Sequence, residues 1–276
     1  MKFAVLGGDE RTLALCRLLR ARGHAVTPCF LGARERCEPL PLASEGTDCV
    51  ILPVPCTRAG ALNALFEAER VPIADLLRGL PEKTRVLAGS AGEIAPMCAG
   101  LGLPLTDYAA REEFAVRNAA LTADGAVRIM LEQSPRSLEG ARVLVCGFGR
   151  IGKMLALRLP ALGARVFVAA RSAADREWAR ALGCGAFSPE EFGARGGWDF
   201  VLNTVPARIF GAERLRPLMG ARLYELASAP GGFDTDAARE LGLAVTPAPG
   251  LPGRFFPEAA GEIVCDTILN IMEEEK

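Results

Sequence analysis

The chain has 276 residues, of which half are hydrophobic and only 6% are aromatic, and its formal net charge at pH 7 is −1. A charge so close to zero argues against nucleic acids and anionic membranes as partners, because neither would be attracted to the protein as a whole. No apolar run approaches the roughly 20 residues that a membrane-spanning helix needs, whereas the length allows two domains, each with its own core.

The first hundred residues alternate between short apolar strands and helices. Strands are predicted at residues 2–6, 25–30, 48–52 and 85–88, with a further short strand near residue 103. Helices are predicted after Gly7-Gly8-Asp9 and over residues 60–69. Such alternation is typical of a small α/β domain with a largely parallel sheet.

A long helical pattern over residues 108–133 leads into a second α/β series. Its strands are predicted at residues 143–146, 165–169, 198–203, 222–226 and 243–245, and a last helix at 257–272. We therefore predict an α/β protein of two doubly wound parallel-sheet domains joined by a long helix. The substrate domain comprises residues 1–125 and 256–276, with the C-terminal helix returning to it, and residues 126–255 form a Rossmann dinucleotide-binding domain.

The segment around three glycines is the most informative part of the chain. An apolar strand, Val143-Leu144-Val145-Cys146, runs directly into Gly147-Phe148-Gly149-Arg150-Ile151-Gly152, and a helical pattern follows. A Gly-x-Gly-x-x-Gly turn between strand and helix is typical of dinucleotide sites, where the helix N-terminus faces the pyrophosphate. The alternative is an ordinary turn that needs glycine for its geometry alone. The order of strand, turn and helix favours the coenzyme site.

The end of the next strand bears on the choice of coenzyme. NAD sites normally carry Asp or Glu there, about 20 residues after the glycines, to bind the ribose hydroxyls. Here Arg171 and Ser172 follow the strand, and Arg176 is close behind. A base and a hydroxyl suit a 2′-phosphate, so we predict NADP, with NAD as the other possibility and a solvated Arg171 as the alternative. The loop Asn203-Thr204-Val205-Pro206 is expected to run beside the same coenzyme.

The nine cysteines are scattered, never spaced as Cys-x-x-Cys, and accompanied by a single histidine, His24. No zinc-ligand spacing results, and thiols such as Cys146 fall within apolar strands, where they pack as small hydrophobic groups. We expect a reduced, cytoplasmic protein without a metal site. His24 lies in a helix-to-strand turn, on the side away from the carboxyl ends of the strands, and is expected to be a surface residue rather than a catalyst.

Several motifs follow one another in a fixed order over nearly the whole chain. They are Gly-Gly-Asp-Glu-Arg at 7–11, Leu-Pro-Val-Pro at 52–55, the helix 111–125, the glycine turn, and the segments 225–234 and 248–253. This ordered set resembles one family, the A subunits of dipicolinate synthase. The resemblance implies oxidation of a dihydrodipicolinate to dipicolinate, pyridine-2,6-dicarboxylate, with NADP as the hydride acceptor. It also implies a flavoprotein-like partner, the B subunit, and a place in the mother-cell cytoplasm of a sporulating bacterium. A homo-oligomer is possible.

A substrate with two carboxylates directs attention to arginines, which bind carboxylates in a bidentate manner. Arg11 follows Gly8 and Asp9 at the start of a helix, and these three residues are predicted to bind substrate together with Pro53, Pro55 and Ser228. Arg111 and Arg117 lie on the long helix, and the family resemblance favours Arg111. Surface positions in solvent are the alternative for all three arginines.

Polar residues within the long helix are the remaining catalytic candidates. Asn118 and Thr122 are four residues apart and share a helix face, from which they could orient the substrate, while Asp124 or Glu112 could accept a proton. The alternative is a helix start, with Thr122 as the capping residue and Asp124 in the first turn. The segment 249–253 is rich in Pro and Gly and is predicted to be a loop that lines the nicotinamide pocket, or a plain connection.

Two other functions fit the same fold. One is a dehydrogenase of 2-hydroxy acids or amino acids, although such enzymes usually rely on a catalytic His or Lys, and this chain has only His24 and few lysines. The other is a non-catalytic NADP-binding subunit that presents substrate to its partner.

Overall fold

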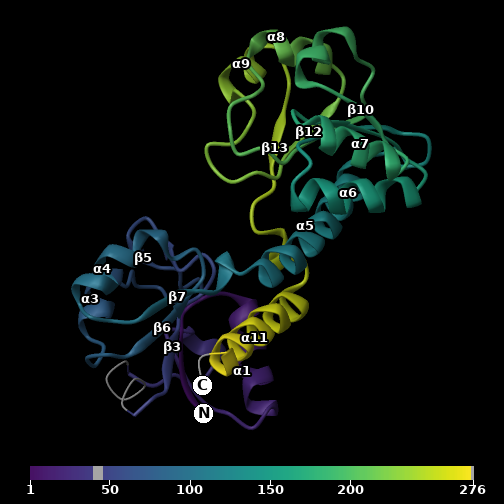
Figure 1. The fold of residues 1–276 in the computed structure, drawn as a ribbon. Coiled ribbons are helices and arrows are strands. Elements are labelled where there is room, and N and C mark those ends of the chain that lie inside the picture. Colours follow the sequence, from purple (N-terminus) through teal and green to yellow (C-terminus); the bar gives the residue numbers. More distant parts are fainter. Residues whose placement is uncertain (40–45, 275–276) are drawn as a thin grey trace. The chain divides into compact units, whose positions relative to one another are not determined.

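A computed structural model describes residues 1–39 and 46–274, which form two compact units. The first unit comprises Met1–Asn118 and Pro252–Lys276, and the second comprises Ala119–Leu251 (Figure 1). Helix α5 (Glu112–Gln133) contains the first boundary between them. The boundaries expected from the sequence, 125/126 and 255/256, lie a few residues further along the chain.

The first unit is built on a five-stranded parallel sheet. Its order is β2-β1-β3-β6-β7, in which β1 is the second strand and the later strands add on its other side. Pro28 stands in β2, where its missing N–H is tolerated because β2 is an edge strand. The strands are β1 (Lys2–Leu6), β2 (Ala25–Cys29), β3 (Cys49–Ile51), β6 (Arg85–Ala88) and β7 (Leu105–Asp107).

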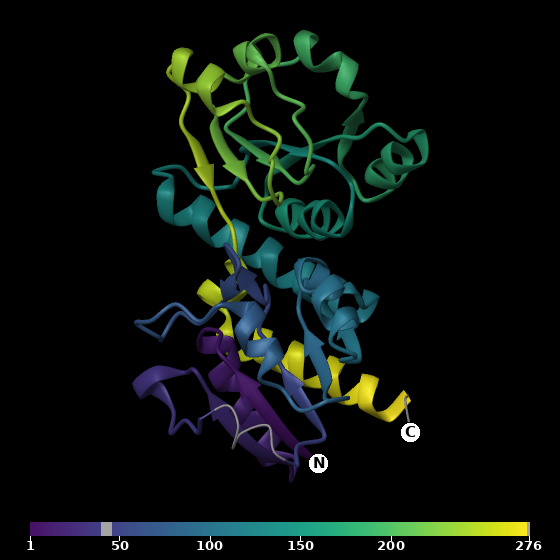
Figure 2. The same cartoon turned by 90° about the vertical axis from the view of Figure 1, so that its left-hand side faces the viewer.

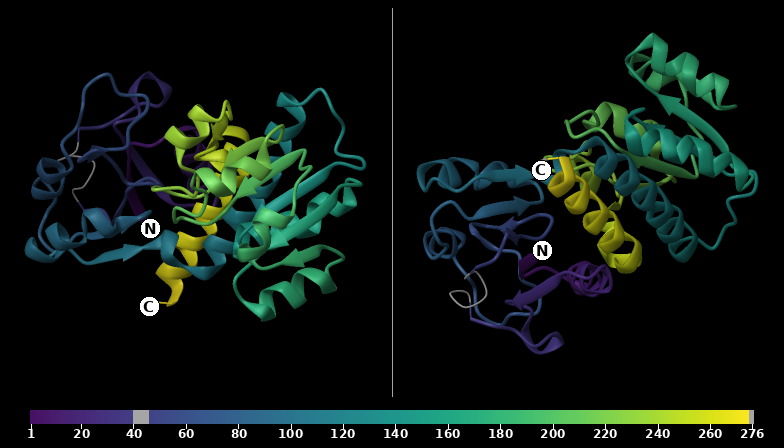
Figure 3. Two further views of the ribbon diagram at one scale, coloured as in Figure 1. Left: turned by 90° about the horizontal axis from the view of Figure 1, so that it is seen from above. Right: turned by 60° about the horizontal axis from the view of Figure 1, so that its bottom comes forward.

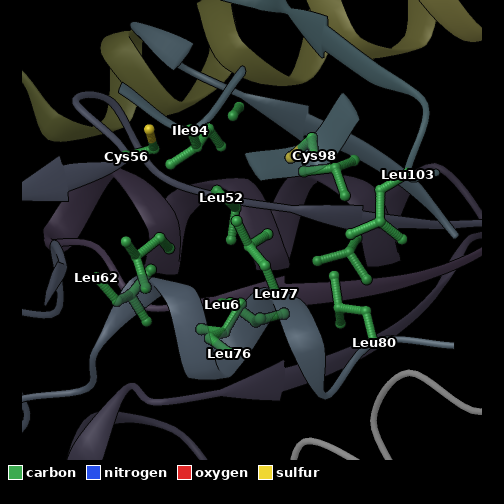
Figure 4. Packing of buried hydrophobic residues seen from close by; sticks show 14 of the residues in the cluster. Leu6, Leu52, Cys56, Leu62, Leu76, Leu77, Leu80, Ile94, Cys98 and Leu103 are labelled. Atoms are coloured by element: carbon green, nitrogen blue, oxygen red, sulfur yellow. The ribbon is translucent and has the colours of Figure 1, made fainter. Parts of the chain in front are cut away.

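One face of this sheet packs against two short helices, α3 (Ile73–Arg78) and α4 (Ala95–Gly100). Leu6 and Leu52 from the strands and their ends meet Leu76 and Leu77 of α3 and Cys98 of α4 in a single buried cluster (Figure 4). The buried side chains of this cluster are Leu, Ile, Val, Ala and Cys, and one partly buried aromatic residue, Phe30, packs against them.

Helix α1 (Glu10–Ala21) and the C-terminal helix α11 (Pro257–Glu274) lie side by side in the same unit (Figures 1 and 3). Gly261 allows the close approach, since a Cβ there would stand 2.6 Å from the Cβ of Ala14. At the rim, Asp266 accepts hydrogen bonds from Arg22, just past the end of α1, and from Arg117 of α5. The last helix therefore returns to the first unit, although Leu251 ends the second.

The helix predicted over residues 60–69 is wrong. The chain forms instead an antiparallel hairpin of β4 (Thr57–Arg58) and β5 (Ala61–Leu62), turning at Gly60 with φ +76°. The backbone N–H groups here do not form the i to i−4 hydrogen bonds of a helix. Leu62 donates instead to the carbonyl of Val71, and Asn63 donates to that of Cys56. Tertiary hydrogen bonds thus replace the local bonds of a helix. Local helix propensity cannot reveal such a replacement.

The second unit holds a six-stranded parallel sheet of order β10-β9-β8-β11-β12-β13 (Figure 2). Counted along the chain within this unit, that order is 3-2-1-4-5-6, the arrangement of dinucleotide-binding folds. The predicted fold class is therefore confirmed. The strands are β8 (Arg142–Cys146), β9 (Arg165–Ala169), β10 (Gly185–Phe187), β11 (Phe200–Asn203), β12 (Arg222–Glu225) and β13 (Val245–Pro247).

Helices α6 (Arg150–Ala161) and α7 (Ala173–Ala181) follow β8 and β9, and the short helices α8 (Ala212–Leu215) and α9 (Thr235–Glu240) follow β11 and β12. Leu144, Val201 and Leu223 from the sheet pack with Leu215 of α8 and Ala238 of α9 in the core of this unit. Among the helices of residues 1–39 and 46–274, none has the length and apolar character needed to cross a membrane.

The loop predicted over residues 249–253 is also wrong in part, because a short helix, α10 (Leu251–Phe255), begins there. Pro252 is accommodated because it stands in the first turn, where its nitrogen needs no hydrogen-bond partner. Its carbonyl accepts from the N–H of Phe256. Similarly, α5 is continuous through Thr122, so the alternative of a new helix start at that residue is wrong.

Candidate functional site

The glycine turn at the end of β8 has the geometry that its sequence predicts. Gly147 adopts φ +92°, and a Cβ there would stand 2.6 Å from Thr204 Oγ1. A Cβ on Gly152 would lie 2.3 Å from the carbonyl oxygen of Gly147, so only glycine lets α6 pack onto the turn. A Cβ on Gly149, by contrast, would meet no atom within 4 Å. Gly149 thus leaves space beside the backbone.

The N-terminus of α6 faces this turn without a capping side chain, because Gly149 is the N-cap residue. The first N–H groups of a helix and its positive dipole end attract anions, above all when no side chain accepts from them. An open glycine position at a helix start is the cradle that a pyrophosphate requires. The residues present therefore fit a dinucleotide.

A pocket of about 740 Å³ lies next to the turn, at the carboxyl ends of β8, β9 and β11. Its volume falls within the range of roughly 300–1,000 Å³ that is usual for ligand sites. Among the residues predicted to bind coenzyme, those lining it are Gly147, Phe148, Gly149, Arg171, Ser172, Thr204, Val205 and Pro206. The sequence did not single out its other lining residues, which include Asp175, Pro189, Glu190, Phe192, Ile209 and Arg214.

Most of the pocket residues that the sequence analysis missed share a feature that could have been read from the sequence. Pro189, Glu190 and Phe192 follow β10, while Ile209 and Arg214 follow β11, so both groups lie in connections that leave the carboxyl edge of the sheet. Ligands bind at that edge in open α/β sheets. Strand β10 was not predicted, and its connection was therefore overlooked.

Arg171 and Ser172 stand at the tip of β9, as predicted, and both are exposed. The Ser172 hydroxyl accepts from the N–H of Asp175 and caps α7, which leaves its own hydrogen available to a ligand. Arg176 differs from the prediction, because its guanidinium donates to the carbonyls of Ala170 and Arg171 and does not line the pocket. Arg176 instead holds the backbone in place just after the end of β9.

Asn203 also departs from its predicted contact with coenzyme. Its side chain is completely buried and hydrogen-bonded within the protein, with Nδ2 donating to the Val205 carbonyl and to Glu225 Oε1, and Oδ1 accepting from the Val205 N–H. Arg150, Ile151 and Gly152 belong to the first turn of α6 and lie outside the pocket lining.

The residues predicted to bind substrate in the first unit come together at the carboxyl ends of β1 and β3. Arg11 donates to both carboxylate oxygens of Asp9, and its Nη2 lies 2.6 Å from the carbonyl oxygen of Val54, between Pro53 and Pro55. The backbone of Gly8 lies against Pro53, since a Cβ on Gly8 would be 3.2 Å from the Cβ of Pro53.

The side chain of Arg11 is only 12% exposed and therefore held in one place. Gly253 of α10 lies against its guanidinium, because a Cβ there would stand 2.5 Å from Arg11 Nε. Tyr108, a residue that the sequence did not indicate, is buried behind the same loop and donates its hydroxyl to the Leu52 carbonyl. Burial raises the pKa of Tyr108, so its hydroxyl stays protonated.

The remaining candidates are distributed over several places. Arg111 forms a bidentate ion pair with Glu274 of α11 and a second pair with Glu113, so its guanidinium already binds two carboxylates. Asn118 and the buried Thr122 lie one turn apart on α5. Asp124 is ion-paired with Arg158 of α6, and Ser228 is exposed in the connection after β12.

His24 lies near the chain's N-terminus, where its Nδ1 is 3.4 Å from the Met1 nitrogen and its ring meets Phe3 edge-on. This position is at the amino ends of the strands, as expected for a residue outside the catalytic site. The nine cysteines are free thiols. In the parts of the chain that the structure describes, no three His, Cys, Asp or Glu side chains are grouped so that they could hold a metal ion.

Two family models match the chain. Residues 2–109 match the N-terminal domain of the dipicolinate synthase A subunit, and residues 113–215 match the NAD-binding domain of D-isomer specific 2-hydroxyacid dehydrogenases. The second match covers the glycine turn and every residue that lines the pocket. The second unit is therefore a nicotinamide-dinucleotide-binding domain of the dehydrogenase type.

Similarity to known proteins extends over almost the entire length. The chain is 29% identical to the dipicolinate synthase A subunit of Bacillus subtilis (strain 168), covering 99% of this chain and 96% of that protein. The crystal structure of the Bacillus subtilis dipicolinate synthase A chain superposes with a TM-score of 0.88 at 28% identity, over 99% and 96% of the two chains. The A subunit from Bacillus halodurans gives 0.88 at 25% identity, over 98% and 96%. The resemblance seen in the motifs is confirmed: the chain is similar over almost its whole length to dipicolinate synthase A subunits.

Proposed function

We propose that this chain is the oxidoreductase subunit of a dipicolinate synthase, which oxidises a dihydrodipicolinate to dipicolinate with NADP as the acceptor. The observation that carries the proposal is the open glycine turn and its pocket in a chain that is similar, along its whole length, to the A subunit of dipicolinate synthase. A dinucleotide pocket implies redox chemistry, and the family similarity supplies the substrate.

The preference for NADP is supported by the tip of β9. Arg171 is exposed there with no acceptor among the described side chains, and the Ser172 hydroxyl is beside it. Asp175 and Glu190 also line the pocket and would repel a phosphate, but neither occupies the strand tip from which a carboxylate binds the ribose hydroxyls. Arginine at this place favours the 2′-phosphate, and NAD is the alternative.

The coenzyme, when bound, supplies the hydride acceptor, and the organic chemistry is its own. The protein has to hold a flat dicarboxylate ring and remove one proton as the ring becomes aromatic. Arg11 is suited to bind one substrate carboxylate because Asp9 and the Val54 carbonyl fix its guanidinium plane. Glu112 and Asp124 of α5 are the candidate proton acceptors; Asp124 already binds Arg158.

The assembly and cellular place of the chain are proposed from its family. A relative whose name makes it the A subunit of an enzyme implies a B subunit, which we expect to be flavoprotein-like, and a homo-oligomer is also possible. We place the activity in the mother-cell cytoplasm of a sporulating bacterium, where dipicolinate is made.

The test is a reconstituted reaction with both subunits, dihydrodipicolinate and NADP or NAD, followed through the absorbance of the reduced coenzyme and of dipicolinate. We expect one reduced coenzyme for each dipicolinate formed, with NADP preferred. Dipicolinate formed without coenzyme reduction would instead favour a non-catalytic coenzyme-binding role. Reduction of coenzyme by D-lactate but not by dihydrodipicolinate would favour a 2-hydroxy acid dehydrogenase.

A further inference from the structure

Glu225, at the carboxyl end of β12, accepts four hydrogen bonds and is not among the residues that line the coenzyme pocket. Its Oε1 accepts from Asn203 Nδ2 at 2.6 Å and from the Ala227 N–H at 3.1 Å, while Oε2 accepts from the N–H groups of Gly232 at 2.7 Å and Phe233 at 3.3 Å. All four partners are donors. Only an ionised carboxylate, which accepts on both oxygens, satisfies them together.

Two of these partners hold the wall of the coenzyme pocket, which consists of residues 204–209. Asn203 bonds to both the N–H and the carbonyl of Val205, at one end of the wall. The carbonyl of Gly232 accepts from the N–H of Ile209, at the other end. Val205 and Ile209 both line the pocket. Glu225 is therefore the common anchor of the two ends.

The wall has little freedom to move toward the glycine turn. A Cβ placed on Gly147 would stand 2.9 Å from Val205 Cγ2 and 2.6 Å from Thr204 Oγ1, which itself donates to the Cys146 carbonyl. The turn that receives the pyrophosphate and the wall held by Glu225 are thus in direct contact. A change in the position of the wall changes the width of the site.

We propose that Glu225, through Asn203 and Gly232, is a positioning residue that sets the geometry of the dinucleotide pocket without touching the coenzyme. The inference rests on the proposed coenzyme site. A purely stabilising residue would affect only the free energy of folding. A positioning residue also affects the affinity for coenzyme, here through four hydrogen bonds that lie outside the pocket.

The experiment compares coenzyme dissociation constants, measured by calorimetric titration with NADP, and melting temperatures in variants of the full chain. Glu225→Gln keeps the side chain's shape but turns an NH2 group toward N–H donors, and we expect about tenfold weaker NADP binding. The fitted stoichiometry reports the folded fraction, so a lower affinity cannot be mistaken for partial unfolding.

Asp199→Asn is the matched control. Asp199, at the amino ends of β8 and β11, also accepts through both carboxylate oxygens, from the side chain of Arg136 and the N–H of Arg142, and it is not among the residues that line the pocket. Its loss should lower the melting temperature of the same unit while leaving the NADP dissociation constant within about twofold. Equal weakening by both variants would overturn the proposal, as would an unchanged dissociation constant in Glu225→Gln.

Two further variants keep the test decisive if Glu225→Gln folds poorly. Gly232→Ala leaves every charge in place, but its Cβ would stand 2.4 Å from Asn203 Nδ2 and must displace that amide, so it should also weaken NADP binding. The second variant, Asn203→Asp, replaces the Nδ2 donor by an oxygen that faces both the Val205 carbonyl and Glu225, so it should weaken NADP binding as well. Absence of NADP and NAD binding by the unaltered chain would refute the proposed function; normal binding with insensitive variants would refute only this inference.

Discussion

Replacing Gly149 and Gly152 separately by alanine is expected to separate coenzyme binding from folding. Gly149 has φ −73°, which any residue adopts, and its Cβ would meet nothing within 4 Å. Gly149→Ala should therefore fold as well as the wild type or be more stable by about 0.4–1 kcal/mol, since alanine restricts the unfolded chain. The methyl group would occupy the space proposed for the pyrophosphate, and we expect coenzyme binding to weaken on the order of 10–100-fold, or about 1.4–2.7 kcal/mol.

Gly152→Ala should behave in the opposite way. Its Cβ would lie 2.3 Å from the carbonyl oxygen of Gly147 and 3.0 Å from its carbon, and backbone atoms cannot rotate aside as a flexible side chain does. Helix α6 must shift away from β8. Overpacking of this kind costs about 1–3 kcal/mol, which lowers the melting temperature of a unit of this size by roughly 5–15 °C.

The assay measures thermal unfolding by circular dichroism and coenzyme binding by calorimetry for each variant. Gly163 supplies a third comparison, because its φ of +79° and a nearby Glu139 make alanine unfavourable there, away from the pocket. The reasoning would be refuted if Gly149→Ala bound NADP or NAD as tightly as the wild type, or if Gly152→Ala left the melting temperature unchanged.

Three further outcomes are expected. Arg171→Ala should reduce the ratio of NADP to NAD affinity by about tenfold or more, because a charge-assisted hydrogen bond contributes ~1.5–3 kcal/mol; an unchanged ratio would place Arg171 in solvent. Arg11→Lys should weaken dipicolinate binding, measured by competition, while leaving the coenzyme dissociation constant alone, because lysine cannot keep the bidentate pair with Asp9 that fixes the side chain. Burial alone would raise the pKa of Asp266, but hydrogen bonds from Arg117 and Arg22 keep it below the ordinary value. Its stabilisation is therefore present above the ordinary carboxyl pKa and lost as the pH falls through the lowered one, so Asp266→Asn should reduce the free energy of unfolding by about 1 kcal/mol at neutral pH. In urea titrations this difference should vanish in acid; a constant difference would contradict the assignment.

Local sequence determined the features that depend on neighbours along the chain. The apolar strand before Gly147, the glycine spacing and the helix after it specify a dinucleotide turn, because the positive φ of Gly147 and the close contact of Gly152 with the Gly147 carbonyl both arise within six residues. Arg171 and Ser172 were placed at the strand tip by the same strand–turn–helix order. Both sheets were predictable in class, since alternation of buried strands and helices leaves few other architectures.

Tertiary structure decided whatever depends on partners distant in sequence. Residues 60–69 form no helix because their amides find other partners, Leu62 the carbonyl of Val71 and Leu65 that of Gly8, and Pro252 could enter a helix because its place is in the first turn. Asn203 and Arg176 carry donors that suit a coenzyme, yet Glu225 and the carbonyls of Ala170 and Arg171 accept those hydrogen bonds. A sequence shows which side chains can form hydrogen bonds, whereas only the folded chain shows which acceptor lies within about 3 Å of each donor, because a hydrogen bond depends on distance and direction in space.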